Sequence, residues 1–292
     1  MNLKVVKRKR TNIRFERLMK QSFLRTIIVL QLLLFAFYAK AYDFKYGNFC
    51  YTITSIPKRT VEVAKSNINY TGKVIIPSKV RYKDREWTVT GIGSYAFMNR
   101  TGITELILPP TLKYIDSACL TGCVSLKYLN LPDGVILKGA ALMGAGMQFI
   151  EIPRNTKFYG NLQLEDMRNL QTVSIKEGVD SIFNYVFQHD RLLTKVIMPN
   201  TLKYLGYGVF DDCRSLRTIK IPASVTKIES PLLDSNCGVT SIYVQWQEPI
   251  EIDDKTFPNG KYLDATLYVP KGTKEVYQST NGWSNFLKII EY

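Results

Sequence analysis

A repeat of 21 to 23 residues runs through most of this 292-residue chain and constrains its fold more than any other feature. The clearest copy lies at residues 205–226, where a Phe is followed three residues later by Cys and then by Leu-x-x-Ile-x-Ile-Pro. The proline of this copy is Pro222. Toward the N-terminus, equivalent positions follow one another at intervals of 23, 23, 23, 21 and 23 residues, and one more lies 23 residues after Pro222. These positions are Pro199, Lys176, Pro153, Pro132, Pro109 and Gln245.

Pro222 and its six equivalents are each preceded by three slots that are apolar in every copy, although only 46% of the chain is hydrophobic. The slot one place before holds Leu108, Leu131, Ile152, Ile175, Met198, Ile221 and Val244. The slot three places before holds Leu106, Leu129, Ile150, Val173, Val196, Ile219 and Ile242, and the slot six places before holds Ile103, Leu126, Met147, Leu170, Leu193, Leu216 and Val239. Slots two residues apart point to one side of a strand, so each copy predicts a short strand with one buried side.

A second apolar series recurs every 22 or 23 residues and predicts the opposite wall of each coil. Its members are Phe97, Leu120, Leu142, Leu164, Phe187, Phe210 and Leu233. A single coil has no partner for these side chains, whereas stacked coils bury them in one continuous core. A fixed period in the twenties therefore predicts a leucine-rich-repeat solenoid.

The chain is expected to divide into a leader, two caps and the repeats. The expected ranges are 1–41 for a signal peptide, 42–90 for an N-terminal β cap, 91–246 for the repeats and 247–292 for a C-terminal cap. The expected cap strands are 48–53, 60–64, 72–76 and 87–90, with turns at 46–47 and 83–84. After Trp246 we expect a loop at 247–261, a strand at 266–270 and a short helix over 274–292 that seals the core.

The first 41 residues resemble a secretory leader. They hold ten basic residues and one acidic residue, so +9 of the net charge of +14 lies there and the remainder is only mildly basic. The apolar run at 27–39 is shorter than the roughly 20 residues of a membrane span, and Ala39-Lys40-Ala41 fits a small-x-small cleavage site. We expect a cleaved signal peptide rather than a permanent anchor, with Met19 as a second candidate start.

The repeat motif resembles that of a known family. The pattern Ile-Gly-x-x-Ala-Phe at 92–97 and the pattern of Cys, Leu and Leu-Pro or Ile-Pro at 120–132 and 205–225 are similar to the BspA-like leucine-rich repeats of bacterial surface and secreted proteins of the Bacteroides type. The resemblance implies a right-handed α/β repeat solenoid with terminal caps, and a non-enzymatic protein whose general role is binding. The middle coils depart from the pattern, with small residues at 139–146 and Lys176 in place of proline. Tolerated drift and a local bend are both open interpretations.

The sequence offers few groups for catalysis or for a metal. The single histidine, His189, adjoins Asp190, but a catalytic triad also needs a nucleophile and an oxyanion site. Cys119 and Cys123 are spaced by three residues rather than the two of a zinc knuckle, and no second cluster completes a site. We therefore expect neither an enzyme nor a metal or cofactor.

The five cysteines, an odd number, leave at least one thiol unpaired in any disulfide scheme. Cys123 and Cys213 share one repeat slot, three residues after the wall residue, which favours a structural role as small buried residues. A disulfide between Cys213 and Cys237, which lie one coil apart, is the alternative for an exported protein.

The outward side of the strands is the candidate binding surface. The slots two and four places before each proline point away from the core, and a curved solenoid presents such a ladder for recognition. Our candidate partner-binding residues are Ile107, Tyr128, Phe149, Lys195, Ile197, Lys220 and Tyr243. Scattered exposed apolar residues without a partner are the alternative interpretation.

These patterns favour an exported, non-enzymatic protein that recognises or adheres to an extracellular protein or glycan. The alternative is a structural surface protein without a dedicated ligand. Basic residues do not cluster with aromatic residues along the repeats, so we expect no nucleic-acid partner. The expected location is the cell surface, the periplasm or the medium.

Overall fold

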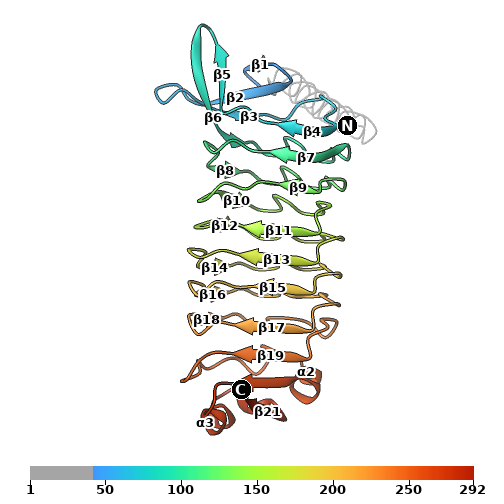
Figure 1. Cartoon of the computed structure of the whole chain (residues 1–292), viewed down its shortest axis with the longest axis vertical. Coiled ribbons are helices and arrows are strands. Elements are labelled where there is room, and N and C mark those ends of the chain that lie inside the picture. The colour runs from blue at the N-terminus through green and yellow to red at the C-terminus, as the bar shows by residue number, and fades with distance from the viewer. Residues whose placement is uncertain (1–41) are drawn as a thin grey trace, which may run out of the picture. The chain divides into compact units, whose positions relative to one another are not determined.

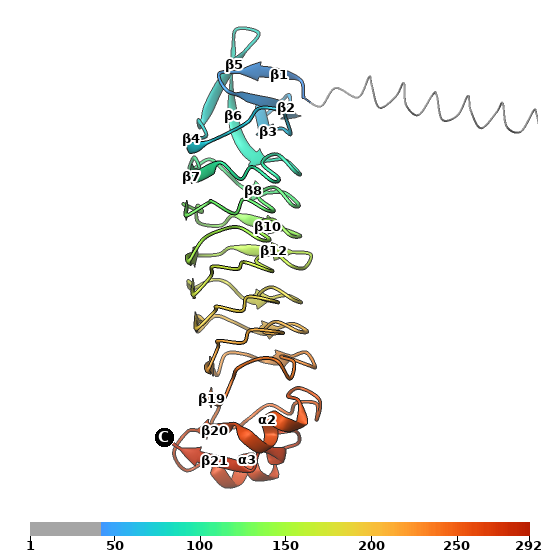
Figure 2. The same ribbon diagram turned by 90° about the vertical axis from the view of Figure 1, so that its right-hand side faces the viewer.

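The computed structural model describes residues 42–292, and the predicted signal peptide at 1–41 lies outside the described residues. Within residues 42–292 the coils stack along one axis between two caps (Figure 1). Figure 2 shows this stack from the side, with the hairpins of the first cap at one end and α2 (Asn259–Asp264), α3 (Lys274–Ser279) and β21 (Lys288–Glu291) at the other. Among these residues no helix is long and apolar enough to cross a bilayer.

Each coil contributes one strand to the face predicted from the proline-based repeat. These strands are β7 (Ile103–Ile107), β9 (Tyr128–Leu129), β11 (Phe149–Ile152), β13 (Thr172–Ile175), β15 (Lys195–Ile197), β17 (Thr218–Ile221) and β19 (Ser241–Val244). Their parallel register aligns the predicted core slots, since Leu106 pairs with Leu129, Val173 with Val196 and Ile219 with Ile242. The predicted solenoid is therefore confirmed.

This strand face is not one continuous sheet. Together with β4 (Gly72–Ile75), β20 (Thr266–Val269) and β21, its strands form three ladders: β4-β7-β9, β11-β13-β15 and β17-β19-β20-β21. No pairing joins β9 to β11 or β15 to β17 within residues 42–292, and both of these neighbours stand visibly further apart than β11 and β13 (Figure 1). The core slots just before each interruption are only partly buried: Leu129, Leu131, Val196 and Met198.

A second line of short strands, which the sequence analysis did not identify, runs along another side of the coils. Its members are β8 (Tyr114–Ile115), β10 (Ile136–Lys138), β12 (Lys157–Tyr159), β14 (Ser181–Ile182), β16 (Tyr204–Leu205) and β18 (Lys227–Ile228). They form the parallel ladders β8-β10-β12 and β14-β16-β18. The strands are too short for a periodic signal to stand out in the sequence.

The third side of each coil is a tight turn around the predicted wall residue, and within 42–292 the repeats contain no helix. All seven wall residues are fully buried, and the rings of Phe187 and Phe210 stack at 5.9 Å. The residue two places after six of the seven wall residues has a positive φ: Asn99, Gly122, Gly144, Asp166, His189 and Asp212. Gly, Asn, Asp and His are the types that tolerate this conformation best, so the backbone accounts for their recurrence.

The N-terminal cap covers the open end of the first coil. Strands β1 (Phe44–Tyr46), β2 (Phe49–Ser55), β3 (Thr60–Val63) and β6 (Arg85–Ile92) form one sheet that continues into β8, and β5 (Lys79–Tyr82) forms a hairpin with β6. Both predicted turns are present, whereas β1 and β5 were not predicted. Phe49 and Tyr70 pack on the first wall residue, Phe97, at 6.5 and 5.1 Å between ring centroids.

One strand expected within the cap also belongs to the repeat face. Strand β4 (Gly72–Ile75) pairs in parallel with β7, and Val74 aligns with Leu106. Pro77 follows it in the way that Pro109 follows β7, but the inserted β5–β6 hairpin separates the two prolines by 32 residues. This insertion hides β4 from a search at a fixed period.

The C-terminal cap differs from its prediction at two points. The expected loop contains a helix, α2 (Asn259–Asp264), and the expected helix over 274–292 is instead α3 (Lys274–Ser279), a 3-10 turn η1 (Trp283–Asn285) and β21 (Lys288–Glu291). Gly282 has a φ of 77°, which ends the helical path, and β21 then pairs with the predicted strand β20 (Thr266–Val269). The sealing role is confirmed, since Trp283 is fully buried and lies 5.9 Å from Trp246.

Replacing Phe187 with Ala should lower the free energy of unfolding by about 3–5 kcal/mol, because it opens a cavity between stacked wall residues. Phe149→Ala is the matched control, since this ring is 54% exposed and its loss should change stability by about 0.5 kcal/mol or less. Urea denaturation of both variants measures the difference. Equal losses would show that Phe149 is a core residue.

Candidate functional site

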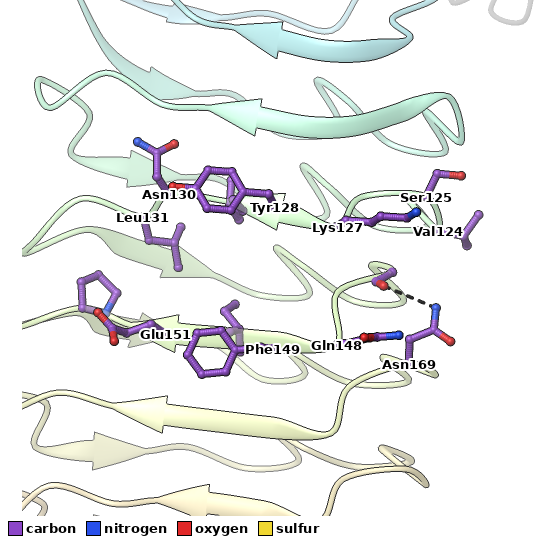
Figure 3. Close-up of a pocket in the computed structure, with 14 residues that line it drawn as sticks. Val124, Ser125, Lys127, Tyr128, Asn130, Leu131, Gln148, Phe149, Glu151 and Asn169 are labelled. Carbon is purple, nitrogen blue, oxygen red and sulfur yellow. Dashed lines mark hydrogen bonds between the residues drawn. The ribbon is translucent and has the colours of Figure 1, made fainter.

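The candidate site is a groove of about 750 Å³ on the strand face, between β9 and β11. Tyr128 on β9 and Phe149 on β11 border it, and their side chains are 53% and 54% exposed. The two rings lie one above the other on the outer side of the strands (Figure 3). Two of the predicted partner-binding residues therefore border the same groove.

The groove lies where the repeat is shortest. The interval between Pro132 and Pro153 is 21 residues, against 23 for the neighbouring intervals. Strand β9 is only two residues long, because the side chain of the next residue, Asn130, takes over the backbone bonding. Asn130 Oδ1 accepts the Leu108 N–H at 2.7 Å, and its Nδ2 donates to the Leu108 carbonyl at 3.1 Å.

Polar residues surround the two rings. Lys127, Gln148 and Asn169 lie toward the start of the strands, and Glu151 lies toward their end (Figure 3). Asn169 Nδ2 donates to the Gly146 carbonyl at 3.4 Å, and Glu151 pairs with Lys176 at 3.0 Å. These residues were not predicted from the sequence, although the small residues at 139–146 and the short interval distinguish this coil from the others.

The other candidate residues lie along the same face but not at the groove. Lys195 and Ile197 are on β15, and both are exposed, while Ile107 on β7 is half-buried. Lys220 and Tyr243 form a separate cluster toward the C-terminal cap, with the Lys220 ammonium 5.3 Å from the Tyr243 ring and Tyr243 stacked on Tyr268 at 4.3 Å. The candidate binding residues therefore lie at no fewer than three separate places on the strand face.

The histidine does not pair with its sequence neighbour. His189 Nδ1 lies 3.0 Å from Asp212 Oδ2 in the next coil, and Arg191 and Arg214 donate to the same carboxylate at 2.7 and 2.6 Å. These hydrogen bonds hold the pKa of Asp212 well below its usual value against the opposing effect of burial. His189 also lines a cavity of about 530 Å³ with Glu165, Asp166 and Arg168, and this cavity includes no Ser, Thr or Cys.

Asp190 instead points into the core, in the slot held by Cys123 and Cys213 in other coils. It is fully buried, and its Oδ1 accepts the Met167 N–H at 2.8 Å while Oδ2 has no partner. Burial raises the pKa of this carboxyl well above 3.8, and the nearby Asp166 and Glu165 add to the shift. Asp190 is a structural carboxyl in this arrangement.

The cysteines are structural as well. All five are buried and unpaired, which leaves the Cys213–Cys237 disulfide unformed. Cys123 Sγ donates to the Phe97 carbonyl and Cys213 Sγ to the Phe187 carbonyl, each at 3.1 Å. Burial raises the pKa of Cys123 and Cys237 to about 11. Between Tyr42 and Tyr292 no three His, Cys, Asp or Glu side chains are grouped so that they could hold a metal ion.

Stacked short parallel strands with one copy of the apolar repeat motif per coil define a leucine-rich-repeat solenoid. The model of the BspA type leucine-rich repeat region matches this chain in six copies, at residues 79–190, 137–240 and 180–280. The chain belongs to this family, whose members are generally non-catalytic and typically bind proteins. No curated protein sequence matches it.

Several solved structures are similar to this chain. A leucine-rich repeat protein from Bacteroides ovatus is 21% identical, with 86% of this chain and 77% of that chain covered and a TM-score of 0.43. A leucine rich cell surface protein from Faecalibacterium prausnitzii is 14% identical, with 82% and 97% covered and a TM-score of 0.38. The leucine-rich repeat protein of T. pallidum is 18% identical, with 60% and 90% covered and a TM-score of 0.45.

Replacing Asp190 with Asn should stabilise the protein at pH 7.5 and change little at pH 3.5. The folded state keeps a proton that the unfolded chain releases near its usual pKa of 3.8, so stability falls as the pH rises above that value. The gain at pH 7.5 is about 1.4 kcal/mol for each unit by which folding raises the pKa. Urea denaturation at both pH values measures it.

The matched control is Asp180→Asn, which changes an exposed aspartate ten residues earlier in the chain. It should shift the unfolding free energy by less than about 0.5 kcal/mol at either pH. An Asp190→Asn effect of the same size at pH 3.5 and pH 7.5 would contradict the assignment of a buried, protonated carboxyl.

Proposed function

We propose that this chain is an exported recognition protein that binds an extracellular protein or glycan partner through the strand face at the β9–β11 groove. The observation that carries the proposal is the pair of half-exposed rings, Tyr128 and Phe149, on either side of a concave feature. Aromatic residues are enriched among the side chains that dominate binding energies, and large exposed apolar groups mark interaction sites.

The groove has the general make-up of a binding site rather than of a catalytic one. Apolar walls supply affinity, and a few polar groups at the edge, here Lys127, Gln148 and Glu151, supply orientation. Export rests on the leader pattern of residues 1–41, whose basic start precedes an apolar run and a small-x-small site.

Replacing both Tyr128 and Phe149 with Ala should weaken partner binding at least tenfold, since anchor residues at an interface typically contribute about 2 kcal/mol or more each. The measurement is binding of the purified protein to arrays of glycans and of extracellular matrix proteins. The melting temperature should change by less than about 2 °C, because neither ring belongs to the core.

Tyr159→Ala is the matched control, because Tyr159 is 55% exposed but lies on β12, away from the groove. It should bind as the wild type does. Binding that survives the double substitution would move the site elsewhere, and arrays on which the wild type binds nothing would favour a structural surface protein without a dedicated ligand.

A further inference from the structure

The groove is bordered by two strand edges whose backbone groups are not used by the fold. In a parallel ladder, successive residues direct their N–H and C=O groups alternately to the two neighbouring strands. Directly before β11 the Gln148 carbonyl accepts the Thr172 N–H at 3.2 Å, and at the end of β11 the Ile152 carbonyl accepts the Lys176 N–H at 2.9 Å. The backbone groups of Phe149 and Glu151 therefore point the other way, toward β9.

The edge of β9 is open in the same manner. The pairing of Tyr128 on β9 with Glu105 on β7 is equivalent to the pairing of Thr172 on β13 with Phe149 on β11. The backbone N–H and C=O groups of Tyr128 therefore point toward β7. Leu129, the next residue, directs its N–H and C=O toward β11. Since no ladder joins β9 to β11 in the described part of the chain, the groups of Leu129, Phe149 and Glu151 face each other across the groove without pairing.

The floor of the groove is apolar and partly uncovered. Leu129 and Leu131 are only partly buried, whereas their equivalents on the preceding strand, Leu106 and Leu108, are 0% and 3% exposed. The floor thus offers contact for a side chain that points inward, while Tyr128 and Phe149 offer contact for side chains that point outward. Side chains that alternate between two sides are a property of an extended peptide.

We propose that an extended segment of a partner protein, about four residues long, binds between β9 and β11 as an added strand. This inference rests on the proposed function and names the class of its ligand. Strand β11 has four residues, and a strand of that length spans about 13 Å at 3.3 Å per residue. Addition of a strand derives its affinity from backbone hydrogen bonds and its specificity from alternate side chains. A glycan has no regular series of donors and acceptors at strand spacing.

A pair of proline substitutions tests whether the β11 edge is open. Glu151→Pro removes an N–H that faces the groove, and Ser174→Pro removes the equivalent N–H on β13, which faces β11 within the ladder. Ser174→Pro should lower the melting temperature by about 6–12 °C, because a proline inside a sheet removes a ladder bond. Glu151→Pro should lower it by less than about 3 °C. Equal losses would overturn the proposal.

A library of random heptapeptides displayed on phage tests the ligand class. Panning against the wild-type protein should enrich peptides with apolar residues at alternate positions. Their affinity should fall at least tenfold for Glu151→Pro relative to Glu151→Ala, because only the proline removes the N–H while both substitutions remove the Lys176 ion pair. N-methylation of a synthetic peptide at alternate residues should weaken binding to the same extent.

The outcomes separate this inference from the proposed function. Peptides that bind Glu151→Pro and Glu151→Ala equally, or a library that enriches nothing, overturn the added strand. If the Tyr128 and Phe149 substitutions still abolish binding to a glycan or a protein on the arrays, the proposed site stands with a different ligand class. If those substitutions have no effect on any ligand, both proposals fail.

Discussion

Contact between equivalent apolar side chains of neighbouring coils is the interaction on which the rest of this structure depends. Leu106, Val173 and Ile219 are almost completely buried, and each aligns with the equivalent apolar residue of the next coil in a parallel ladder. Burial of each such side chain stabilises the fold by roughly 1.5–3 kcal/mol, which offsets the entropy lost when its coil becomes ordered. The two end coils have only one neighbour, and for this reason the chain carries aromatic caps at both ends.

The stack can open on one side without losing this core. Across the coils that contain β9 and β11, the turn backbones remain bonded, with the Leu120 N–H donated to the Ala141 carbonyl at 2.8 Å and the Gly122 N–H to the Met143 carbonyl at 2.9 Å. The second line of strands also continues through this region from β8 to β12. Two sides of the solenoid therefore maintain the stacking while the third side presents a groove.

The elements that recur at a fixed period were predicted correctly from the sequence, whereas the elements that interrupt the period were not. The slots of Leu129, Val196 and Ile219 and the wall series were correct because burial fixes their residue types at fixed intervals. The strand at β4 was predicted, but its place on the repeat face was missed because a hairpin insertion changes its interval. Strand β21 was mistaken for a helix because a cap follows no period. Tyr128 and Phe149 were predicted to be outward-facing, but the absence of pairing between β9 and β11 was not, because a residue period does not reveal which neighbouring strands pair.

Amide hydrogen exchange, measured residue by residue, tests the central claim that the stack is continuous in its core and open along one edge of β11. Along β13, which has a strand on both sides, all four amides of residues 172–175 should be protected. Along β11 protection should alternate, with Ile150 and Ile152 slow and Phe149 and Glu151 fast. Uniform protection along β11 would contradict the account, because it would mean that β9 and β11 are paired and that no open edge exists.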